Sequence, residues 1–329
     1  MPTPRLLNLS AAIAARRIAL QYLAAALKAR RRLRDASDDD ALHNFRVALR
    51  RLRSTLRAYR PWINARVVPR KLRKRLRRLA RTTNAARDAE VALTWVRAQR
   101  RLGLRARPGV QRFMQELDLQ RERAYAEMRE EATAEFDRLY PRLRTALRPL
   151  ESRRPVTRLR DVVGPLLLQQ AEALEADFRR IRSVADAETI HAARIDAKRL
   201  RYLLEPLAAE IDGGARLIAR FKRMQDVFGE FTDAQVLARE LADAARRIGG
   251  DWAAHATQQV LARSDEPVHE PQALIGVLLL ATRVRHRQQQ GFRAIRRYYL
   301  GTHAARLLAP IRRDGDSLVR QRGPRRRSH

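Results

Sequence analysis

An internal repeat constrains the fold of this chain more than any other feature of its sequence. The string HNFRVALRRLR at His43 to Arg53 returns 148 positions later as HAARIDAKRLR at His191 to Arg201, with histidine, basic residues and leucine at matching offsets. A weaker similarity follows each copy in the same order, between Leu76 to Val91 and Phe221 to Val236. The repeat predicts a chain that is built twice, with two copies of one basic site around a pseudo-two-fold axis.

The composition predicts that both copies are helical. Glycine and proline are sparse, at 13 and 14 residues, aromatic residues make up 5% of the chain, and Ala, Leu and Arg dominate it. This profile favours long helices over sheets. The 329 residues suffice for two units that each bury a core. We therefore expect an all-α fold of two four-helix bundles related by internal duplication and pseudo-two-fold symmetry.

Helix start and stop signals set the expected boundaries. We expect a first four-helix half at 1–150, a linker at 151–160, a second four-helix half at 161–312 and a basic disordered tail at 313–329. Within the halves, helices are expected over about 10–34, from the acidic cluster at 37–40 to about 61, and over about 69–101, 110–150, 161–182, 186–209, 215–248 and 271–308. A loop is expected at 103–109, glycine breaks at 213–214 and 249–250, and an extra helix or long loop at 251–265.

The charge of the chain indicates a polyanionic partner. The formal net charge is +34, from 70 basic and 36 acidic residues, and such self-repulsion opposes a compact state unless counterions or a polyanion relieve it. Only five of the basic residues are lysine. The planar guanidinium groups of the arginines suit bidentate contacts to phosphate.

The first copy of the repeat places its basic residues along one side of a helix. At about 100° per residue, a sector of about 80° contains His43, Arg46, Arg50, Arg53 and Arg57. A neighbouring sector about 100° away, which we expect to be buried, contains Phe45, Leu49, Leu52, Leu56 and Tyr59. Basic residues beside a buried stripe belong at the edge or groove of a bundle, where a row of guanidinium groups matches a row of phosphates.

The second copy and the helices that follow extend this pattern. Beside Leu200, Leu204 and Leu207, the second copy carries His191, Arg194, Lys198 and Arg201. The third helix of the first half adds Arg70, Arg73, Arg77 and Arg81 on one face, and the nearest equivalents in the second half are Lys222 and Arg223. Solvated faces have no need to repeat histidine and basic residues at fixed offsets, whereas a binding site does.

No metal site, cofactor site or catalytic residue is predicted. Asp40 with His43, and Glu188 with His191, have the i, i+3 spacing of a carboxylate and imidazole metal pair. Their cationic neighbours would repel a metal ion, and the acidic residues are better explained as stabilisers of a first helical turn. The chain lacks a P-loop, a glycine-rich dinucleotide loop, a nucleophile elbow and an acidic magnesium cluster, and it contains no cysteine.

The sequence predicts a soluble, cytoplasmic protein. Arg16 and Arg17 interrupt the apolar run near the start, so no signal peptide is recognised. The longest apolar run, Leu274 to Ala281, is far shorter than the roughly 18 residues of a membrane span.

The two basic motifs resemble the conserved histidine α-helical domain family, known as CHAD. The resemblance rests on His-x-x-Arg-Val-x-x-Arg-Arg-Leu-Arg in the first copy and Arg-x-x-x-Lys-Arg-Leu-Arg-Tyr in the second, and it covers about residues 5 to 312. Phe228 to Asp233 is similar to the family's Leu-Gly-x-x-x-Asp turn, whereas Ala80 to Asp88 lacks the expected glycine. The resemblance implies two pseudo-symmetric four-helix bundles with a basic central cavity that binds inorganic polyphosphate, and association with polyphosphate granules.

These observations predict a non-catalytic polyphosphate-binding protein. Its predicted ligand-facing residues are His43, Arg46, Arg50, Arg53, Arg57, Arg73, Arg77, His191, Arg194, Lys198, Arg201, Lys222 and Arg223. The two histidines either donate hydrogen bonds to phosphate or fix the motif helix against a neighbour. The alternative is a sequence-nonspecific nucleic-acid-binding protein, since a charge of +34 attracts DNA or RNA. The basic stripes contain no aromatic residue for base stacking, which favours polyphosphate.

Overall fold

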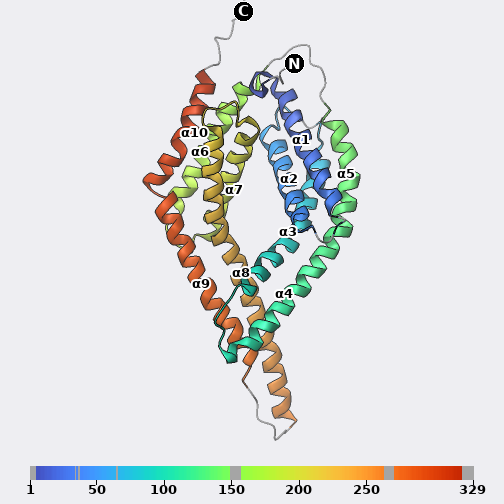
Figure 1. The fold of residues 1–329 in the computed structure, drawn as a ribbon, viewed down its shortest axis with the longest axis vertical. Coiled ribbons are helices and arrows are strands. Elements are labelled where there is room, and N and C mark those ends of the chain that lie inside the picture. Colours follow the sequence, from blue (N-terminus) through green and yellow to red (C-terminus); the bar gives the residue numbers. More distant parts are fainter. Residues whose placement is uncertain are drawn as a thin grey trace, which may run out of the picture. The chain divides into compact units, whose positions relative to one another are not determined.

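The structure consists of helices and the loops that join them (Figure 1). It is a computed structural model, and it describes residues 5–33, 35, 38–63, 66–148, 157–262 and 270–320. Over these ranges there is no strand, only an isolated β-bridge between Ser10 and Arg158. The all-α prediction is confirmed.

Among the described residues, five α-helices lie in the first part of the chain, before residue 149, and five in the second part, after residue 156. The first part contains α1 (Ala11–Arg32), α2 (Asp39–Ala58), α3 (Arg70–Arg97), α4 (Arg107–Glu127) and α5 (Thr133–Ala146), with a π-helical turn at Met128–Ala132 between the last two. The second part contains α6 (Leu159–Arg180), α7 (Ala187–Leu204), α8 (Gly214–Leu261), α9 (Gln272–Tyr299) and α10 (Thr302–Arg320). Short 3₁₀ helices lie at Leu6–Asn8, Leu104–Ala106 and Glu205–Leu207.

The helices form two compact units, and each unit takes segments from both parts of the chain. Unit 1 comprises Met1–Thr83, Glu127–Phe228 and Ile295–His329, and unit 2 comprises Asn84–Ala126 and Gly229–Ala294. The compact units therefore do not follow the expected halves at 1–150 and 161–312. The physical reason is the length of α3 and α8, because each of these helices continues from unit 1 into unit 2 without a break.

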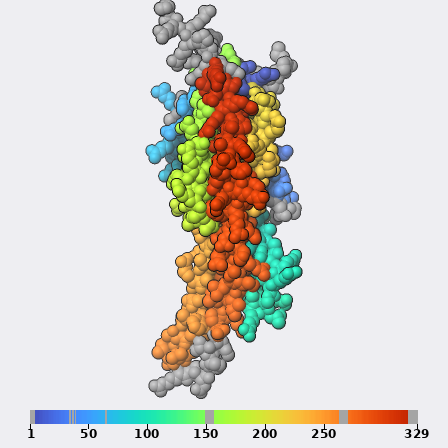
Figure 2. Space-filling view, turned by 90° about the vertical axis from the view of Figure 1, so that its left-hand side faces the viewer, coloured from blue at the N-terminus to red at the C-terminus, as the bar shows by residue number. Residues whose placement is uncertain are grey.

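Unit 1 contains the two helices that carry the repeated motif. Within it, α1 packs on α2 and α5, α6 packs on α7 and α10, and contacts of α1 with α6 and of α2 with α7 join these groups. Figure 2 shows α10 lying along α6 on one face of this unit. The N-terminal 3₁₀ turn is held by Glu210, whose carboxylate accepts hydrogen bonds from the backbone N–H groups of Leu6 and Leu7 at 2.7 and 3.0 Å.

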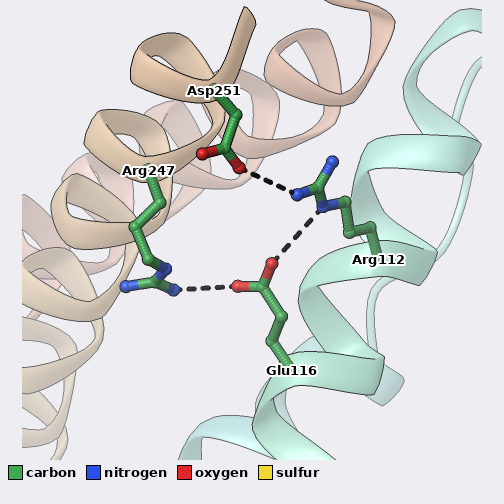
Figure 3. Close-up of polar contacts among 4 residues, drawn as sticks. All are labelled: Arg112, Glu116, Arg247 and Asp251. Atoms are coloured by element: carbon green, nitrogen blue, oxygen red, sulfur yellow. Dashed lines mark hydrogen bonds and ion pairs between the residues drawn. The ribbon is translucent and has the colours of Figure 1, made fainter. Parts of the chain in front are cut away.

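Unit 2 has its own apolar core, formed by four helices. Apolar side chains from the C-terminal part of α3, from α4, from α8 and from α9 bury one another there, with Phe113 and Leu280 at most 1% exposed. At the surface, Glu116 of α4 accepts from Arg112 at 3.4 Å and from Arg247 of α8 at 2.8 Å, and Arg112 also contacts Asp251 (Figure 3). Exposed ion pairs of this kind contribute little stability, about 0–1 kcal/mol each, so the apolar core holds the unit together.

The expected helix break at 249–250 is wrong. α8 is one continuous helix from Gly214 to Leu261, so it passes through 249–250 and into the segment at 251–265, where an extra helix or a long loop was expected. Phe228 to Asp233 lies inside this helix, as the helix expected over 215–248 predicts. The expected loop at 103–109 also ends early, because Gly109 lies in α4. A helix tolerates glycine at a cost of about 1 kcal/mol relative to alanine, and the packing of a long helix outweighs that cost.

Both expected unstructured segments of the second part are shorter than predicted. The linker expected at 151–160 is wrong at its end, because α6 begins at Leu159, and Asp161 accepts a hydrogen bond from the Arg158 N–H within the first turn. The tail expected at 313–329 is wrong over 313–320, where α10 continues and buries Asp314, Gly315 and Leu318. The rest of that linker and tail, at 151–156 and 321–329, lies outside the described residues.

The last long helix is divided at a glycine that the sequence analysis did not single out. Gly301 has a φ of 61°, a left-handed conformation that glycine adopts without the strain of a Cβ. It separates α9 from α10, whereas a single helix was expected over 271–308.

Candidate functional site

The repeated basic motif occupies α2 and α7, which contact each other in unit 1. The predicted apolar face of α2 is confirmed, since its members are between 0% and 2% exposed: Phe45, Leu49, Leu52, Leu56 and Tyr59. Leu200, Leu204 and Leu207 beside the second copy are fully buried as well. Both motif helices are thus anchored by the face next to their basic residues.

Four arginines of α2 and α3 group around Arg53, whose pKa responds to the charges of the other three. We call them the α2–α3 cluster: Arg50, Arg53, Arg77 and Arg81. Partial burial lowers the pKa of the Arg53 guanidinium, and the positive charges of the other three lower it further. Among the described residues, no carboxylate forms an ion pair with any member of this cluster.

The depth of the cluster follows from the position of the stripe beside the apolar face. Arg50 and Arg53 are half-buried, whereas Arg77 and Arg81 are exposed at its edge. The Nε atom of Arg50 is buried and has no hydrogen-bond partner in the described part of the chain. Half-buried guanidinium groups without counter-charges form a surface that favours anions, because a bound anion would replace both the missing hydrogen bonds and the missing charge.

Arg46 and Arg73 lie on the same helices as the cluster. Arg46 is half-buried, and its guanidinium donates a hydrogen bond to the Thr83 carbonyl of α3. A carbonyl satisfies a donor without cancelling its charge, so Arg46 also ties α2 to α3. Arg73 is half-buried, and one of its terminal nitrogens has no hydrogen-bond partner among the described residues.

The second copy of the motif is partly neutralised by carboxylates of its own segment. Arg199 forms an ion pair with Asp196, and Arg201 Nε lies 3.4 Å from Glu205 Oε1. The Arg201 guanidinium also stands 5.2 Å from the centre of the Tyr202 ring. Arg201 thus has a charge partner within the protein, while its buried Nε atom has no hydrogen-bond partner among the described residues.

One motif arginine connects the two copies instead of facing a ligand. Arg51 of α2 donates two hydrogen bonds to Glu205, at 2.7 and 3.0 Å, and its guanidinium lies about 6 Å from the rings of Tyr22 and Tyr202. Burial disfavours the charged form of Arg51, but the contact with Glu205 outweighs burial and raises its pKa. This bidentate pair fixes α2 against the end of α7.

The remaining predicted residues are more exposed or lie elsewhere in unit 1. His43 and His191 are exposed in the first turns of their helices. Arg57 is exposed near the end of α2, where partial burial and then the charge of Arg199 lower its pKa. Arg194 and Lys198 are half-buried on α7, while Lys222 and Arg223 are exposed on α8, with Arg223 close to Tyr299.

Arg81 was not among the predicted ligand residues, although it belongs to the α2–α3 cluster. Its position one helical turn after Arg77 on the same face was the available signal. Arg51 was missed as a connecting residue, because its partner Glu205 lies 154 positions away in the chain.

Three pockets in unit 1 lie apart from the predicted residues. They have volumes of about 660, 490 and 590 Å³ and are lined mainly by α3 and α5. None of the three is lined by a predicted ligand residue, because Lys71 and Arg75 face them from the side of α3 opposite to Arg73 and Arg77. The candidate site is thus the arginine surface of α2 and α3, and the predicted basic cavity stays a prediction.

In the part of the chain that the structure describes, no three His, Cys, Asp or Glu side chains group closely enough to hold a metal ion. Its helices also include none that is both long enough and apolar enough to cross a membrane.

The sequence matches a known protein family. The model of the CHAD domain matches residues 17–242, about two thirds of the chain. The chain belongs to the CHAD family. The match contains every predicted ligand residue as well as Arg51, Arg81 and Glu205.

The CHAD fold extends over nearly the whole chain. The crystal structure of the CHAD domain from the plant Ricinus communis matches with a TM-score of 0.65 and 19% sequence identity, over 90% of this chain and 93% of that one. No curated protein matches the chain significantly. At this identity the similarity establishes the fold, and the ligand has to be argued from the residues.

Proposed function

We propose that this CHAD protein is a non-catalytic module that binds inorganic polyphosphate. The observation that carries the proposal is the α2–α3 cluster, in which four arginines lie together without a carboxylate partner among the described residues. Such a group is electrostatically unfavourable in the ligand-free protein and becomes favourable when an anion binds. Polyphosphate binding is also what membership in the CHAD family implies.

The shape of the ligand supports polyphosphate over nucleic acid. Polyphosphate offers closely spaced negative charges without bases, so it needs guanidinium groups and no stacking surface. The motif arginines Arg51 and Arg201 stand within about 6 Å of the rings of Tyr22 and Tyr202. Tyr22 is half-buried and Tyr202 is 4% exposed, so neither ring is an open surface for a base. Proteins that bind single strands usually stack the bases on exposed aromatic rings.

The absence of a catalytic role is part of the proposal. Phosphoryl transfer needs carboxylates that hold magnesium beside the phosphate. In the motif region, Asp196 and Glu205 are instead paired with Arg199 and Arg51. Phosphate release from polyphosphate in the presence of magnesium would contradict this part of the proposal.

We also propose that the chain arose by duplication of a four-helix bundle and that it associates with polyphosphate granules in the cytoplasm. The recurrence of α1 to α5 as α6 to α10 supports duplication, with the last long helix interrupted once in each part. Pseudo-two-fold symmetry would bring the basic surfaces of the two copies to one ligand.

A titration with polyphosphate of defined length tests the function. Replacement of Arg46, Arg50, Arg194 and Lys198 together by alanine is expected to weaken binding by at least 100-fold, since hydrogen bonds to charged groups contribute about 1.5–3 kcal/mol each. The matched control removes the same number of positive charges at four exposed arginines that form no ion pair with the described residues: Arg17, Arg123, Arg216 and Arg293. Equal losses in both variants would show that only total charge matters.

Competition separates the two ligand classes. If DNA displaced bound polyphosphate at equal phosphate concentration, nucleic-acid binding would be the better description. We expect polyphosphate to be retained, and its affinity to fall steeply as salt rises, because binding releases counterions.

A further inference from the structure

The C-terminal end of α8 is a helix without neighbours on most of its surface. Ile248 is the last α8 residue in the apolar core of unit 2. From Asp251 to Leu261, every residue except Ala256 and Gln259 is exposed. Figure 1 shows this end of α8 extending beyond α4 and α9. Helices in water are marginal at this length, and a solvated helix normally carries polar residues all round.

The exposed end carries an apolar face. At about 100° per residue, a sector of about 120° contains what we call the tip face: Ala253, Ala254, Thr257, Val260 and Leu261. Val260 is 68% exposed and Leu261 is 78% exposed. The opposite side carries Asp251, His255 and Gln258, together with Trp252, which is 40% exposed. Adjoining exposed apolar side chains are typical of an interaction surface.

We propose that the tip face pairs with the tip face of a second copy of this chain, as an antiparallel helix pair around a two-fold axis at Thr257. In this arrangement each Leu261 meets the partner's Ala253, and each Val260 meets the partner's Ala254. Large side chains therefore pack on small ones on both sides of the axis, which makes the surface complementary to a second copy of itself, as a two-fold interface requires. The Thr257 hydroxyl donates to the Ala253 carbonyl at 2.7 Å, so burial at the axis leaves no donor unsatisfied.

Charge identifies the second copy as the occupant. Two chains with a net charge of +34 repel each other wherever their arginines meet. The segment from Ile248 to Ala262 contains none of the 70 basic residues, and Asp251 is its only acidic one. It is thus a stretch at which two copies can approach closely without opposing cations.

The pairing is expected to be weak and to strengthen with salt. One helix face of about 20 Å is smaller than the roughly 800 Å² per partner of a standard interface, so a micromolar or weaker dimer is expected. Salt screens the repulsion between the chains and leaves apolar contacts intact. Polyphosphate binding has the opposite salt dependence, so the two inferences succeed or fail separately.

Sedimentation of the full chain over a range of concentrations, at low and high NaCl, tests the pairing. We expect a monomer–dimer equilibrium that shifts toward dimer as salt rises. The variant V260E/L261E is expected to stay monomeric, at least tenfold weaker in association. H255E/Q258E adds two acidic residues to the opposite side of the same helix and is expected to dimerise normally. Both variants should keep the thermal stability of the original chain, because the four side chains are exposed.

The absence of cysteine from the chain permits a second measurement. Thr257→Cys is expected to form a disulfide-linked dimer on mild oxidation, since the two thiols meet at the axis, whereas Gln258→Cys is expected to remain monomeric. A chain that sediments as a monomer at every concentration and salt overturns the proposal. Equal cross-linking of the two cysteine variants, or equal association of the two glutamate variants, overturns it as well.

Discussion

At the scale of single residues, the helical stripe predicted which arginines lie together better than it predicted what each arginine contacts. Arg50, Arg53 and Arg77 were predicted as ligand residues and do lie together, because three- and four-residue spacing fixes which side chains share a helix face. Arg201 was predicted on the same ground, yet it is close to Glu205. Glu205 lies four residues after Arg201, a spacing that brings a carboxylate beside an arginine on a helix, so this pair was visible in the sequence. The pair of Arg51 with Glu205 was not, because 154 positions separate the two residues.

Arg53 provides the most direct test of the α2–α3 cluster. Burial and neighbouring cations lower its pKa, so its charged form is less favourable in the folded protein than in the unfolded chain. Arg53→Met removes the charge and keeps an apolar stem. We expect a higher melting temperature without ligand and about tenfold weaker polyphosphate binding.

Arg17→Met, at an exposed position of α1, serves as control and should change neither the melting temperature nor the affinity appreciably. Lower stability together with unchanged affinity would remove Arg53 from the site.

At the scale of helices, the sequence predicted eight long helices, whereas the described residues contain ten α-helices, and it misjudged several of their ends. Glycine caused most of the errors, because a glycine that ends a helix and a glycine that allows two helices to touch look the same in a sequence. The break at 213–214 is correct, and Gly213 has a positive φ of 64°. Gly109 was assigned to a loop, but it lies in α4, where it makes room for α9.

The crossing of α4 and α9 in unit 2 should be intolerant of any side chain. A Cβ on Gly276 would lie 2.4 Å from the Ala106 carbonyl oxygen and 2.5 Å from the Val110 nitrogen, both backbone atoms. We expect Gly276→Ala to lower the free energy of unfolding by about 1–3 kcal/mol, as overpacking does.

Gly249→Ala is the matched control, since a Cβ there meets nothing within 4 Å and Gly249 lies within the continuous helix α8. It should raise stability by about 0.5–1 kcal/mol. Chemical denaturation measures both, and similar effects at the two sites would contradict this account of the crossing.

At the scale of the whole chain, the repeat did not predict the compact units. The repeated strings of the sequence place their basic motifs on α2 and α7, which both lie in unit 1. Whether corresponding segments pack within or across the repeats depends on helix length. The 28 residues of α3 and the 48 residues of α8 carry both helices from unit 1 into unit 2. No local pattern contains that information.

The net charge of +34 makes the stability of the chain depend on the ions around it. Screening weakens the repulsion among cations, so we expect the melting temperature to rise from low to moderate NaCl. Polyphosphate should raise the melting temperature further at low salt. When the free ligand is at about 100 times its dissociation constant, binding adds about 2.7 kcal/mol to the free energy of unfolding. This increment should shrink as NaCl rises, because the affinity for polyphosphate falls.

Calorimetry measures both effects. Spermine, a polycation, is the control at equal ionic strength and should add nothing beyond screening. A polyphosphate increment that stays constant across salt concentrations would mean that counterion release does not drive binding, and the arginine surface of α2 and α3 would then not be the site.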